Sequence, residues 1–361
     1  MGCYKPMIRR ENLGKWKKAA DGHLYHPANI FSSDRLELYD KKDWGNYKYE
    51  FIPCGKCIGC KLDYSRNWAN RGYLESLLYE QNWFVTLTYD DKYLPYQDEW
   101  TTTEGITYTD QDLEELEWKG TLEPNDFTQF MKNLRQIMKR EYGVDGIRFI
   151  GCGEYGTEER RPHYHLILFN FNIPVDQLYE PHLKKGDYSY KCKLIERAWS
   201  ERKGKSCECM GICEVTPATW NTIAYVARYI TKKINGKESE DFYAMQGEQK
   251  EFFRCSTGIG KGYYDLHKEE IYKSDQILIK NKKGSHWVKP PKYFDDLYEK
   301  EEPEKMKKIK ENRKKLQLQQ LLNKSKLTSL TRWEQLQLEQ DLKEKDAQML
   351  SHRDVIERSK K

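Results

Sequence analysis

The clearest hydrophobic pattern in the chain lies between residues 125 and 140. Six apolar residues recur there at helical spacing and define one face of an amphipathic helix: Phe127, Phe130, Met131, Leu134, Ile137 and Met138. Lys132, Arg135 and Lys139 lie off this face, and Gly143 is expected to end the helix. The pattern therefore predicts one well-defined helix whose apolar face packs on a core.

Three other short segments are rich in apolar, β-branched or aromatic residues, which predicts β-strands. They span residues 83–89, 147–150 and 163–169. A further helix is expected over about residues 64–80, with a buried side made of Trp68, Tyr73, Leu74 and Leu77. A short helix is expected at residues 194–200.

Residues 217–233 also have helical periodicity. The predicted packing face of this helix consists of Trp220, Ile223, Ala227, Ile230 and Ile234. Thr216 can cap its N-terminus, Pro217 suits its first turn, and Gly236 is expected to close it.

Segments with weaker patterns surround these elements. We interpret residues 90–123, which are acidic and polar, and residues 174–193 as surface insertions. Residues 1–60 are rich in Gly, Lys and Tyr, which indicates an arm without a core of its own. From about residue 301, Lys, Glu, Gln and Leu dominate and predict a charged helical tail, partly disordered when alone. Its basic stretch at 305–315 either touches phosphates or is a solvated helical face.

The 361 residues suffice for one large domain or two modest ones. A formal net charge of +5 permits a nucleic-acid partner without demanding one. No apolar run approaches the roughly 20 residues that a membrane span needs, and the N-terminus lacks the apolar core of a signal peptide. We therefore expect a soluble, cytoplasmic protein with no membrane partner.

Two histidines on one predicted strand are candidate metal ligands. His163 and His165 alternate with Tyr164, so both imidazoles point to the same side of the strand. A hairpin after the preceding strand would bring Glu154 beside them. Two imidazoles and a carboxylate with open positions suit Mg²⁺ or Mn²⁺ bound to a phosphate. The alternative is two histidines that are satisfied by other partners or exposed, with Glu154 as a surface carboxylate or as a partner of Arg160 or Arg161.

Two tyrosines one turn apart are candidate nucleophiles. Tyr225 and Tyr229 lie nearly opposite the packing face of the helix at 217–233, so both can face one target. Arg228 and Lys232 lie beside them, and cations favour the phenolate and stabilise charge on phosphorus. The alternative is two amphipathic surface tyrosines next to ordinary basic residues.

Ten cysteines in a chain of this kind indicate free thiols or metal ligands rather than disulfides. Three cysteines have the spacing of metal ligands: Cys54, Cys57 and Cys60. A structural zinc site needs four ligands, and Cys3 is the candidate for the fourth. Iron–sulfur ligation and metal-free thiols are the alternatives. A second cluster is interpreted as simple thiols: Cys207, Cys209 and Cys213.

Three ordered motifs resemble those of HUH endonucleases, and among these the replication initiators of small single-stranded DNA phages, the gokushovirus-type microviruses. They are Phe84-Val-Thr-Leu-Thr-Tyr89, Arg161-Pro-His-Tyr-His165 and Tyr225-Val-Ala-Arg-Tyr229-Ile-Thr-Lys232. Four further segments look like parts of the same group: Pro53–Cys57, Gly153–Gly156, Arg254–Gly260 and Lys289–Tyr293. The resemblance covers most of residues 50–300.

The resemblance implies an α+β fold with a five-stranded antiparallel sheet, packed helices and the histidines on a central strand. We expect an HUH endonuclease domain at 64–236, between a Cys-rich arm at 1–63 and a C-terminal extension at 237–300. The charged tail at 301–361 has no counterpart in the resemblance, and its role stays open. His163, His165 and Glu154 carry over as ligands of Mg²⁺ or Mn²⁺. Tyr225 and Tyr229 carry over as nucleophiles, with Lys232 and Arg228 as supporting cations.

The resemblance also implies rolling-circle replication: nicking of a DNA origin through a 5′-phosphotyrosine, a free 3′-OH primer, and later rejoining of the displaced strand. The expected partners are single-stranded origin DNA and the replication helicase and polymerase of a bacterial host, without a small-molecule cofactor. Three alternatives remain open. They are a relaxase or transposase with the same chemistry, a non-catalytic zinc-stabilised DNA-binding protein, and a metal nuclease that uses activated water.

Overall fold

The computed structural model describes residues 3–19, 24–32, 47–96, 99–109, 120–156, 160–184, 187–203, 206–232, 237–281 and 284–358. The chain divides into two compact units. One consists of Met1–Tyr64 and Glu304–Lys361, and the other of Ser65–Pro303. The division falls within the helix α1 (Ile58–Ser76).

The smaller unit combines the N-terminal segment with the C-terminal helices. Its three-stranded antiparallel sheet has the order β4-β1-β5, with β1 at Met7–Asn12, β4 at Ala28–Ser32 and β5 at Tyr47–Ile52. The other elements are β2 (Lys17–Lys18), β3 (Leu24–Tyr25), α9 (Pro303–Ser325) and α10 (Arg332–Arg358). The Phe51 ring lies edge-on to Trp333 of α10 at a centroid distance of 6.1 Å. The tail is helical as predicted, and it shares a unit with the N-terminal segment.

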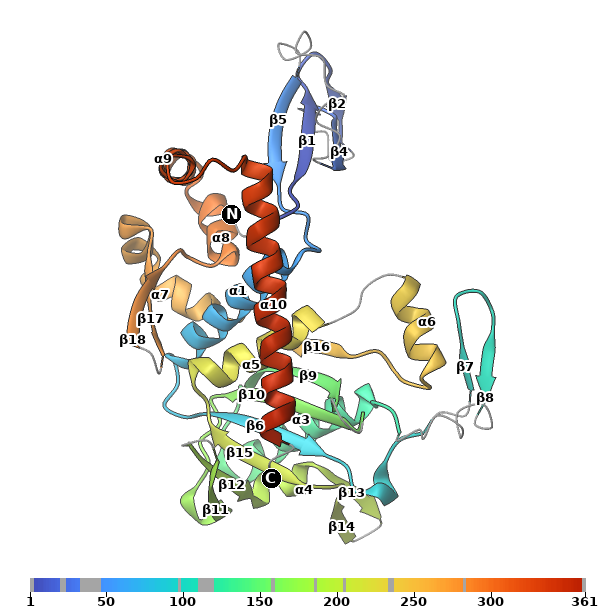
Figure 1. The fold of residues 1–361 in the computed structure, drawn as a ribbon. Helices are drawn as coiled ribbons and strands as arrows, with labels where there is room; N and C mark the ends of the chain where they lie inside the picture. Colours follow the sequence, from blue (N-terminus) through green and yellow to red (C-terminus); the bar gives the residue numbers. More distant parts are fainter. Residues whose placement is uncertain are drawn as a thin grey trace. The chain divides into compact units, whose positions relative to one another are not determined.

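The larger unit contains a seven-stranded antiparallel sheet with the order β11-β12-β15-β6-β10-β9-β16 (Figure 1). Its strands are β6 (Asn82–Thr88), β9 (Arg148–Tyr155), β10 (Pro162–Phe169), β11 (Leu178–Lys184), β12 (Asp187–Cys192), β15 (Cys213–Pro217) and β16 (Phe252–Cys255). The fold is therefore α+β, but the expected count of five strands was too low. Residues 174–193, expected as an insertion, form the β11 and β12 strands at one edge. The strand β10, which carries the two histidines, is internal to the sheet.

The segment 90–123 is only partly a surface insertion. Trp100 is 8% exposed, and Thr121 and Leu122 are buried. The Leu122 backbone N–H donates to the hydroxyl of buried Tyr155 over 3.1 Å. The end of this polar segment therefore packs against the core. The remaining elements of this unit are η3 (Asp91–Tyr93), β7 (Glu99–Thr101), β8 (Thr107–Thr109), α3 (Pro124–Tyr142), η4 (Val175–Gln177), α4 (Lys193–Ala198), β13 (Ser200–Lys203), β14 (Ser206–Cys209), α5 (Trp220–Lys232), α6 (Lys237–Met245), α7 (Lys261–Ser274), β17 (Ile277–Asn281), β18 (Gly284–Val288) and α8 (Lys292–Glu301).

The alternation of side chains along β10 separates two packing faces of the sheet. Tyr164, Leu166 and Leu168 belong to a core cluster that includes the apolar face of α3. Ile167 and Phe169 belong to a second cluster with residues of α5. His163 and His165 fall on the second face, so α5 lies on the histidine side of the sheet.

The helix α3 follows its sequence pattern closely. Its buried residues are Phe127, Phe130, Met131, Leu134 and Met138, and Ile137 is partly buried. Gly143 adopts a left-handed conformation with a φ of 67° and ends the helix, as predicted.

The helix α5 begins later than predicted. Thr216 and Pro217 belong to β15, where Pro217 pairs with Trp83, so neither residue caps the helix. The Thr219 hydroxyl instead accepts the Thr222 N–H over 3.3 Å. Within the predicted packing face, Ile223 and Ala227 are buried, and the unpredicted Val226 is buried with them. The side chain of Ile230, and all of Ile234 and Gly236, lie outside the described residues.

The helix α1 packs closely against α5. A Cβ atom on Gly72 would lie 2.6 Å from Cγ2 of Ile223, so a residue without a side chain is required there. Leu74 is fully buried as predicted, and Trp68 and Tyr73 are partly buried. The expectation for Leu77 was wrong, because it follows the last residue of α1 and is 51% exposed. The close contact between Gly72 of α1 and Ile223 of α5 holds α5 over the face of the sheet that carries the histidines.

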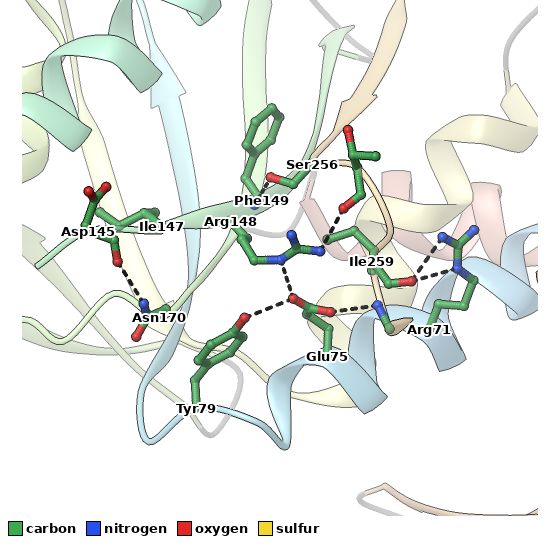
Figure 2. Close-up of polar contacts among 12 residues, drawn as sticks. Arg71, Glu75, Tyr79, Asp145, Ile147, Arg148, Phe149, Asn170, Ser256 and Ile259 are labelled. Atoms are coloured by element: carbon green, nitrogen blue, oxygen red, sulfur yellow. Dashed lines mark hydrogen bonds and ion pairs between the residues drawn. The ribbon is translucent and has the colours of Figure 1, made fainter. Parts of the chain in front are cut away.

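A buried carboxylate connects α1 to the sheet and to the turn before α7 (Figure 2). Glu75, with a side chain 1% exposed, accepts from Arg148 Nε over 2.5 Å and from the backbone N–H of Gly260 over 2.6 Å. The Tyr79 hydroxyl donates to the same carboxylate over 3.2 Å. The Arg71 guanidinium donates to the carbonyl of Ile259 in the same turn. These bonds hold the turn at residues 257–260, which contains Gly258 and Gly260, against α1.

Candidate active site

The antiparallel strands β9 and β10 bring three possible metal ligands together. Glu154 lies directly opposite His163 in the pairing, and His165 is two residues farther along the same face. One ligand atom of each residue lies within 4.8 Å of those of the other two. The arrangement is the one expected for a hairpin between the two predicted strands.

Both imidazoles converge on a single oxygen atom. Nε2 of His163 lies 2.9 Å from Oε1 of Glu154, and Nε2 of His165 lies 3.0 Å from the same oxygen. Burial raises the pKa of the Glu154 carboxyl, but its hydrogen bonds with the two histidines outweigh burial, and the pKa is lowered overall. The carboxylate is therefore ionised at neutral pH, although it is only 3% exposed.

The Nδ1 atom of each histidine also has a hydrogen-bond partner. Nδ1 of His163 lies 3.0 Å from the carbonyl oxygen of Arg161, which can only accept, so this nitrogen carries a proton. Nδ1 of His165 lies 3.0 Å from the Thr86 hydroxyl. Without an ion, protons on Nε2 make the hydrogen bonds to Glu154. An ion that replaced these protons would accept the Nε2 lone pairs, while the protons at Nδ1 stay in place. A cation between them satisfies all three groups, so the residues fit a divalent metal ion.

The two tyrosines of α5 lie over this group of ligands. The ring of Tyr225 meets that of His165 at a centroid distance of 5.2 Å, and the ring of Tyr229 stacks on His165 at 5.9 Å. The two phenol rings are 5.0 Å apart. The helix therefore presents both candidate nucleophiles to the same metal-ligand group, as their spacing predicts.

Two residues of β6 complete the site, and the sequence analysis assigned them no role. Phe84 stacks on His165 at a centroid distance of 5.3 Å and meets Tyr225 edge-on at 6.0 Å. Thr86 lies directly opposite His165 in the β6–β10 pairing. The signal was the alternation of Phe84 and Thr86 along a predicted strand, which puts both on one face once that strand is paired with β10.

The pKa of Tyr229 differs from that of a free phenol. Burial, followed by the charge of Glu154 and the neighbouring Tyr225, raises the pKa of Tyr229 far above its usual value. A phenolate at this position needs a nearby positive charge. The exposed Arg228 guanidinium lies 5.9 Å from the centre of the Tyr225 ring. Lys232 is the last residue of α5, and its side chain lies outside the described residues.

The cysteines separate into two groups of different geometry. The sulfur atoms of the first group lie within 4.8 Å of one another, and the group consists of Cys3, Cys54, Cys57 and Cys60. Cys207, Cys209 and Cys213 form no such ligand group in the part of the chain that the structure describes. All ten cysteines are described, and none of them forms a disulfide.

The chain resembles phage replication proteins over most of its length. Residues 82–234 match a family model described as replication-associated protein ORF2/G2P. Over 333 residues, the chain is 33% identical to the replication-associated protein ORF2 of Spiroplasma virus 4, covering 91% of each protein. The chain belongs to this family of replication-associated proteins.

Two other phage proteins are related to this replication-associated protein. It is 29% identical to the replication-associated protein VP4 of Bdellovibrio phage phiMH2K, covering 76% of the chain and 74% of that protein. It is 26% identical to the replication-associated protein ORF4 of Chlamydia phage 1, covering 69% of the chain and 54% of that protein. These relatives confirm the resemblance to microvirus replication proteins.

No solved structure matches this replication-associated protein, so the HUH assignment of its fold stays a prediction. Among the described helices, none combines the length and the apolar character that crossing a bilayer requires.

Proposed function

We propose that this replication-associated protein initiates rolling-circle replication by nicking single-stranded origin DNA through a 5′-phosphotyrosine. The observation that carries the proposal is the contact of both Tyr225 and Tyr229 with His165, whose Nε2 meets the Glu154 carboxylate. Two phenols and three metal ligands at one location suit transesterification of a phosphodiester. The family contributes the link to phage replication.

The reaction exchanges one phosphodiester for another. The phenolic oxygen of one tyrosine loses its proton and attacks the scissile phosphorus, and the bond from phosphorus to the 3′-oxygen breaks. The 3′-oxygen takes a proton and leaves as a 3′-OH, while the 5′-phosphate stays on the tyrosine. No water is consumed, so a later attack by a 3′-OH on the phosphotyrosine restores the phosphodiester and frees the phenol.

Glu154, His163 and His165 would hold the divalent ion, for which we propose Mg²⁺ or Mn²⁺. When bound, such an ion supplies positive charge that polarises the phosphodiester and favours the phenolate. The protein residues position the reaction. Phe84 and Thr86 orient His165, and Arg228 adds positive charge beside Tyr225. Lys232 is proposed to add a second cation at the end of α5.

Two tyrosines permit a repeated cycle. While one holds the 5′ end of the cut strand, the other can attack the regenerated origin, and the freed 3′-OH then closes the displaced strand into a circle. The 3′-OH left by the first cut primes a host polymerase, and a host helicase opens the duplex. The protein would act in the cytoplasm of a bacterial host.

The test is an adduct assay with labelled single-stranded origin DNA and Mn²⁺, resolved on a denaturing protein gel. We expect a covalent adduct with the wild type and with at least one single variant, and none with the Tyr225→Phe/Tyr229→Phe double variant. If one single substitution alone abolishes the adduct, that tyrosine starts the reaction. Tyr188→Phe is a matched control, because Tyr188 is an exposed phenol of β12.

Two outcomes would overturn the proposal. A wild type that binds the DNA but never forms an adduct would favour a non-catalytic DNA-binding protein. Cleavage that survives the double tyrosine substitution and is lost in His163→Ala would favour a nuclease that activates water. Target DNA, rather than the site residues, would distinguish an initiator from a relaxase or a transposase.

We predict that His163→Ala and His165→Ala each abolish cleavage and leave DNA affinity within about threefold of the wild type, since phosphate contacts elsewhere supply binding. Chelation with EDTA should abolish cleavage of the wild type, and excess Mn²⁺ should restore it. Cleavage and filter-binding measurements on the same preparations check this. A parallel fall in binding and cleavage would contradict a role restricted to catalysis.

A further inference from the structure

The cleavage chemistry leaves the four-cysteine group of the smaller unit unused. Cys3 lies at the start of the described chain, and Cys54 follows the strand β5. Cys57 directly precedes α1, and Cys60 lies in its first turn. Cys3 is 3%, Cys57 8% and Cys60 9% exposed, so three of the four thiols are removed from water.

The spacing of the sulfur atoms matches the edge of a metal-centred tetrahedron. Sγ of Cys54 lies 3.9 Å from Sγ of Cys60, and Sγ of Cys57 lies 3.9 Å from Sγ of Cys3. Zinc–sulfur bonds of about 2.3 Å give a tetrahedral edge of about 3.8 Å. A disulfide would need about 2.05 Å. The sulfur atoms therefore lie at the separation that a shared ion requires.

Backbone N–H groups donate to three of the four sulfur atoms. The N–H of Tyr4 donates to Sγ of Cys57 over 3.3 Å, and the N–H of Cys54 donates to Sγ of Cys3 over 3.2 Å. The N–H of Cys57 donates to Sγ of Cys54 over 3.3 Å. Gly55 has a φ of 74° in the turn between two of the cysteines. Three N–H donors aimed at sulfur form the surroundings in which metal-bound thiolates are stable.

Apart from these cysteines, the described part of the N-terminal segment buries few side chains that could stabilise its fold. Among the described residues as far as Tyr64, five side chains are buried: Cys3, Pro6, Ile8, Cys57 and Cys60. Three of these five are members of the group. A segment with so small an apolar core depends on crosslinks or a metal for stable folding.

We propose that Cys3, Cys54, Cys57 and Cys60 bind one structural Zn²⁺ ion. Four thiolates fill all positions of a tetrahedral ion and leave none open for a substrate, which is typical of structural zinc sites. The ion would tie the N-terminus of the chain to the start of α1 and hold β5 between them. The proposal is independent of the DNA-cleavage function, since a protein that forms no adduct can still contain this ion.

The test measures metal content in the full-length chain by elemental analysis. The His163→Ala/His165→Ala variant removes the other group of candidate ligands, and we expect it to retain about one zinc per chain. Cys60→Ser should lose most of this zinc. Cys255→Ser is the matched control, since Cys255 is a free thiol of β16 outside the group, and it should retain all of it.

X-ray absorption at the zinc edge of the wild type keeps the proposal testable if Cys60→Ser does not fold. Four sulfur neighbours at about 2.3 Å are expected. Absence of zinc from the wild type, iron in its place, or a zinc shell with nitrogen or oxygen neighbours would each overturn the proposal. Zinc retained in full by soluble Cys60→Ser would do the same.

Discussion

Single residues of the site divide into those that would bind the ion and those that position its ligands. The Thr86 hydroxyl lies 3.0 Å from Nδ1 of His165, the ring nitrogen that does not meet Glu154, so it belongs to the second kind. We predict that Thr86→Val, which keeps the shape and removes the hydroxyl, weakens Mn²⁺ binding about 10- to 100-fold. Thr86→Ser should bind nearly as tightly as the wild type. Titration calorimetry with Mn²⁺ and no DNA measures this directly.

Thr88 provides the control for that prediction. It is two residues along β6 on the same face, and its hydroxyl donates to the carbonyl of Ile212 rather than to a histidine. Thr88→Val should therefore leave Mn²⁺ affinity within about twofold of the wild type. Equal losses in the two valine variants would mean that β6, rather than the Thr86 hydroxyl, sets the affinity.

The site residues that could be identified from the sequence are those related by a short, regular spacing along the chain. His163 and His165 alternate on one strand, and Tyr225 and Tyr229 are one helical turn apart, so each pair follows from a local period. Phe84 and Thr86 have no such signature. Their roles depend on the pairing of β6 with β10, which joins segments far apart in the chain.

At the scale of structural elements, a single buried charge attaches α1 to its neighbours. Glu75 accepts from Arg148 on β9 and from the N–H of Gly260 before α7 (Figure 2). We predict that Glu75→Gln lowers the free energy of unfolding by about 3 kcal/mol, because it leaves Arg148 without its counter-charge. Partial exposure of Arg148 keeps this loss at the lower end of the range for buried pairs. Urea denaturation followed by circular dichroism measures it.

Glu80→Gln is the matched control, since Glu80 is exposed and lies shortly after the end of α1. It should change the free energy of unfolding by less than about 0.5 kcal/mol. If Glu75→Gln is as stable as this control, the buried ion pair does not connect α1 to the sheet energetically.

Elements were predictable where local patterning and tertiary packing agree. The helix α3 has a continuous apolar stripe, a proline in its first turn and a glycine at its end, and it formed as predicted. At Thr216-Pro217 the local signals for a helix start were overridden, because these residues pair with β6 as part of β15. Residues 174–193 lack a strong apolar alternation, so their pairing as β11 and β12 left little local trace.

The whole molecule has an interior rich in tyrosine, and this gives it a predictable response to alkali. Burial is the largest cause that raises the pKa of Tyr89, Tyr155, Tyr164 and Tyr229 above their value in the unfolded chain. Below about pH 10 both states keep these protons. Above it the unfolded chain loses them first, so the free energy of unfolding should fall, by up to about 1.4 kcal/mol per pH unit for each tyrosine.

Denaturant titrations between about pH 8 and pH 11 check this slope. Tyr89→Phe/Tyr164→Phe removes two buried phenols that share a hydrogen bond of 2.9 Å, and it should make the slope shallower. Tyr188→Phe, which removes an exposed phenol, should leave the slope unchanged. An identical slope in all three proteins would assign alkaline unfolding to other groups.

The domain organisation of the molecule lay partly beyond the sequence. Composition correctly predicted a helical tail, and it distinguished this tail from the N-terminal segment. That these two ends of the chain share one compact unit was not predictable, because the contact of Phe51 with Trp333 has no local signature. The strands β6, β9 and β10 of the seven-stranded sheet were easier to foresee, since these segments are rich in apolar, β-branched and aromatic residues.

The direct opposition of Glu154 and His163 on β9 and β10 also limits how this sequence can diverge. Loss or gain of one codon within either strand would turn Glu154 or the histidines toward the α3 face and separate the acid from its bases. Length changes in the connection between the strands carry no such penalty. Among descendants of this gene, insertions and deletions should therefore collect between residues 156 and 161, while the two strands keep their length. The site is inherited as a fixed pairing of two strands rather than as three separate residues.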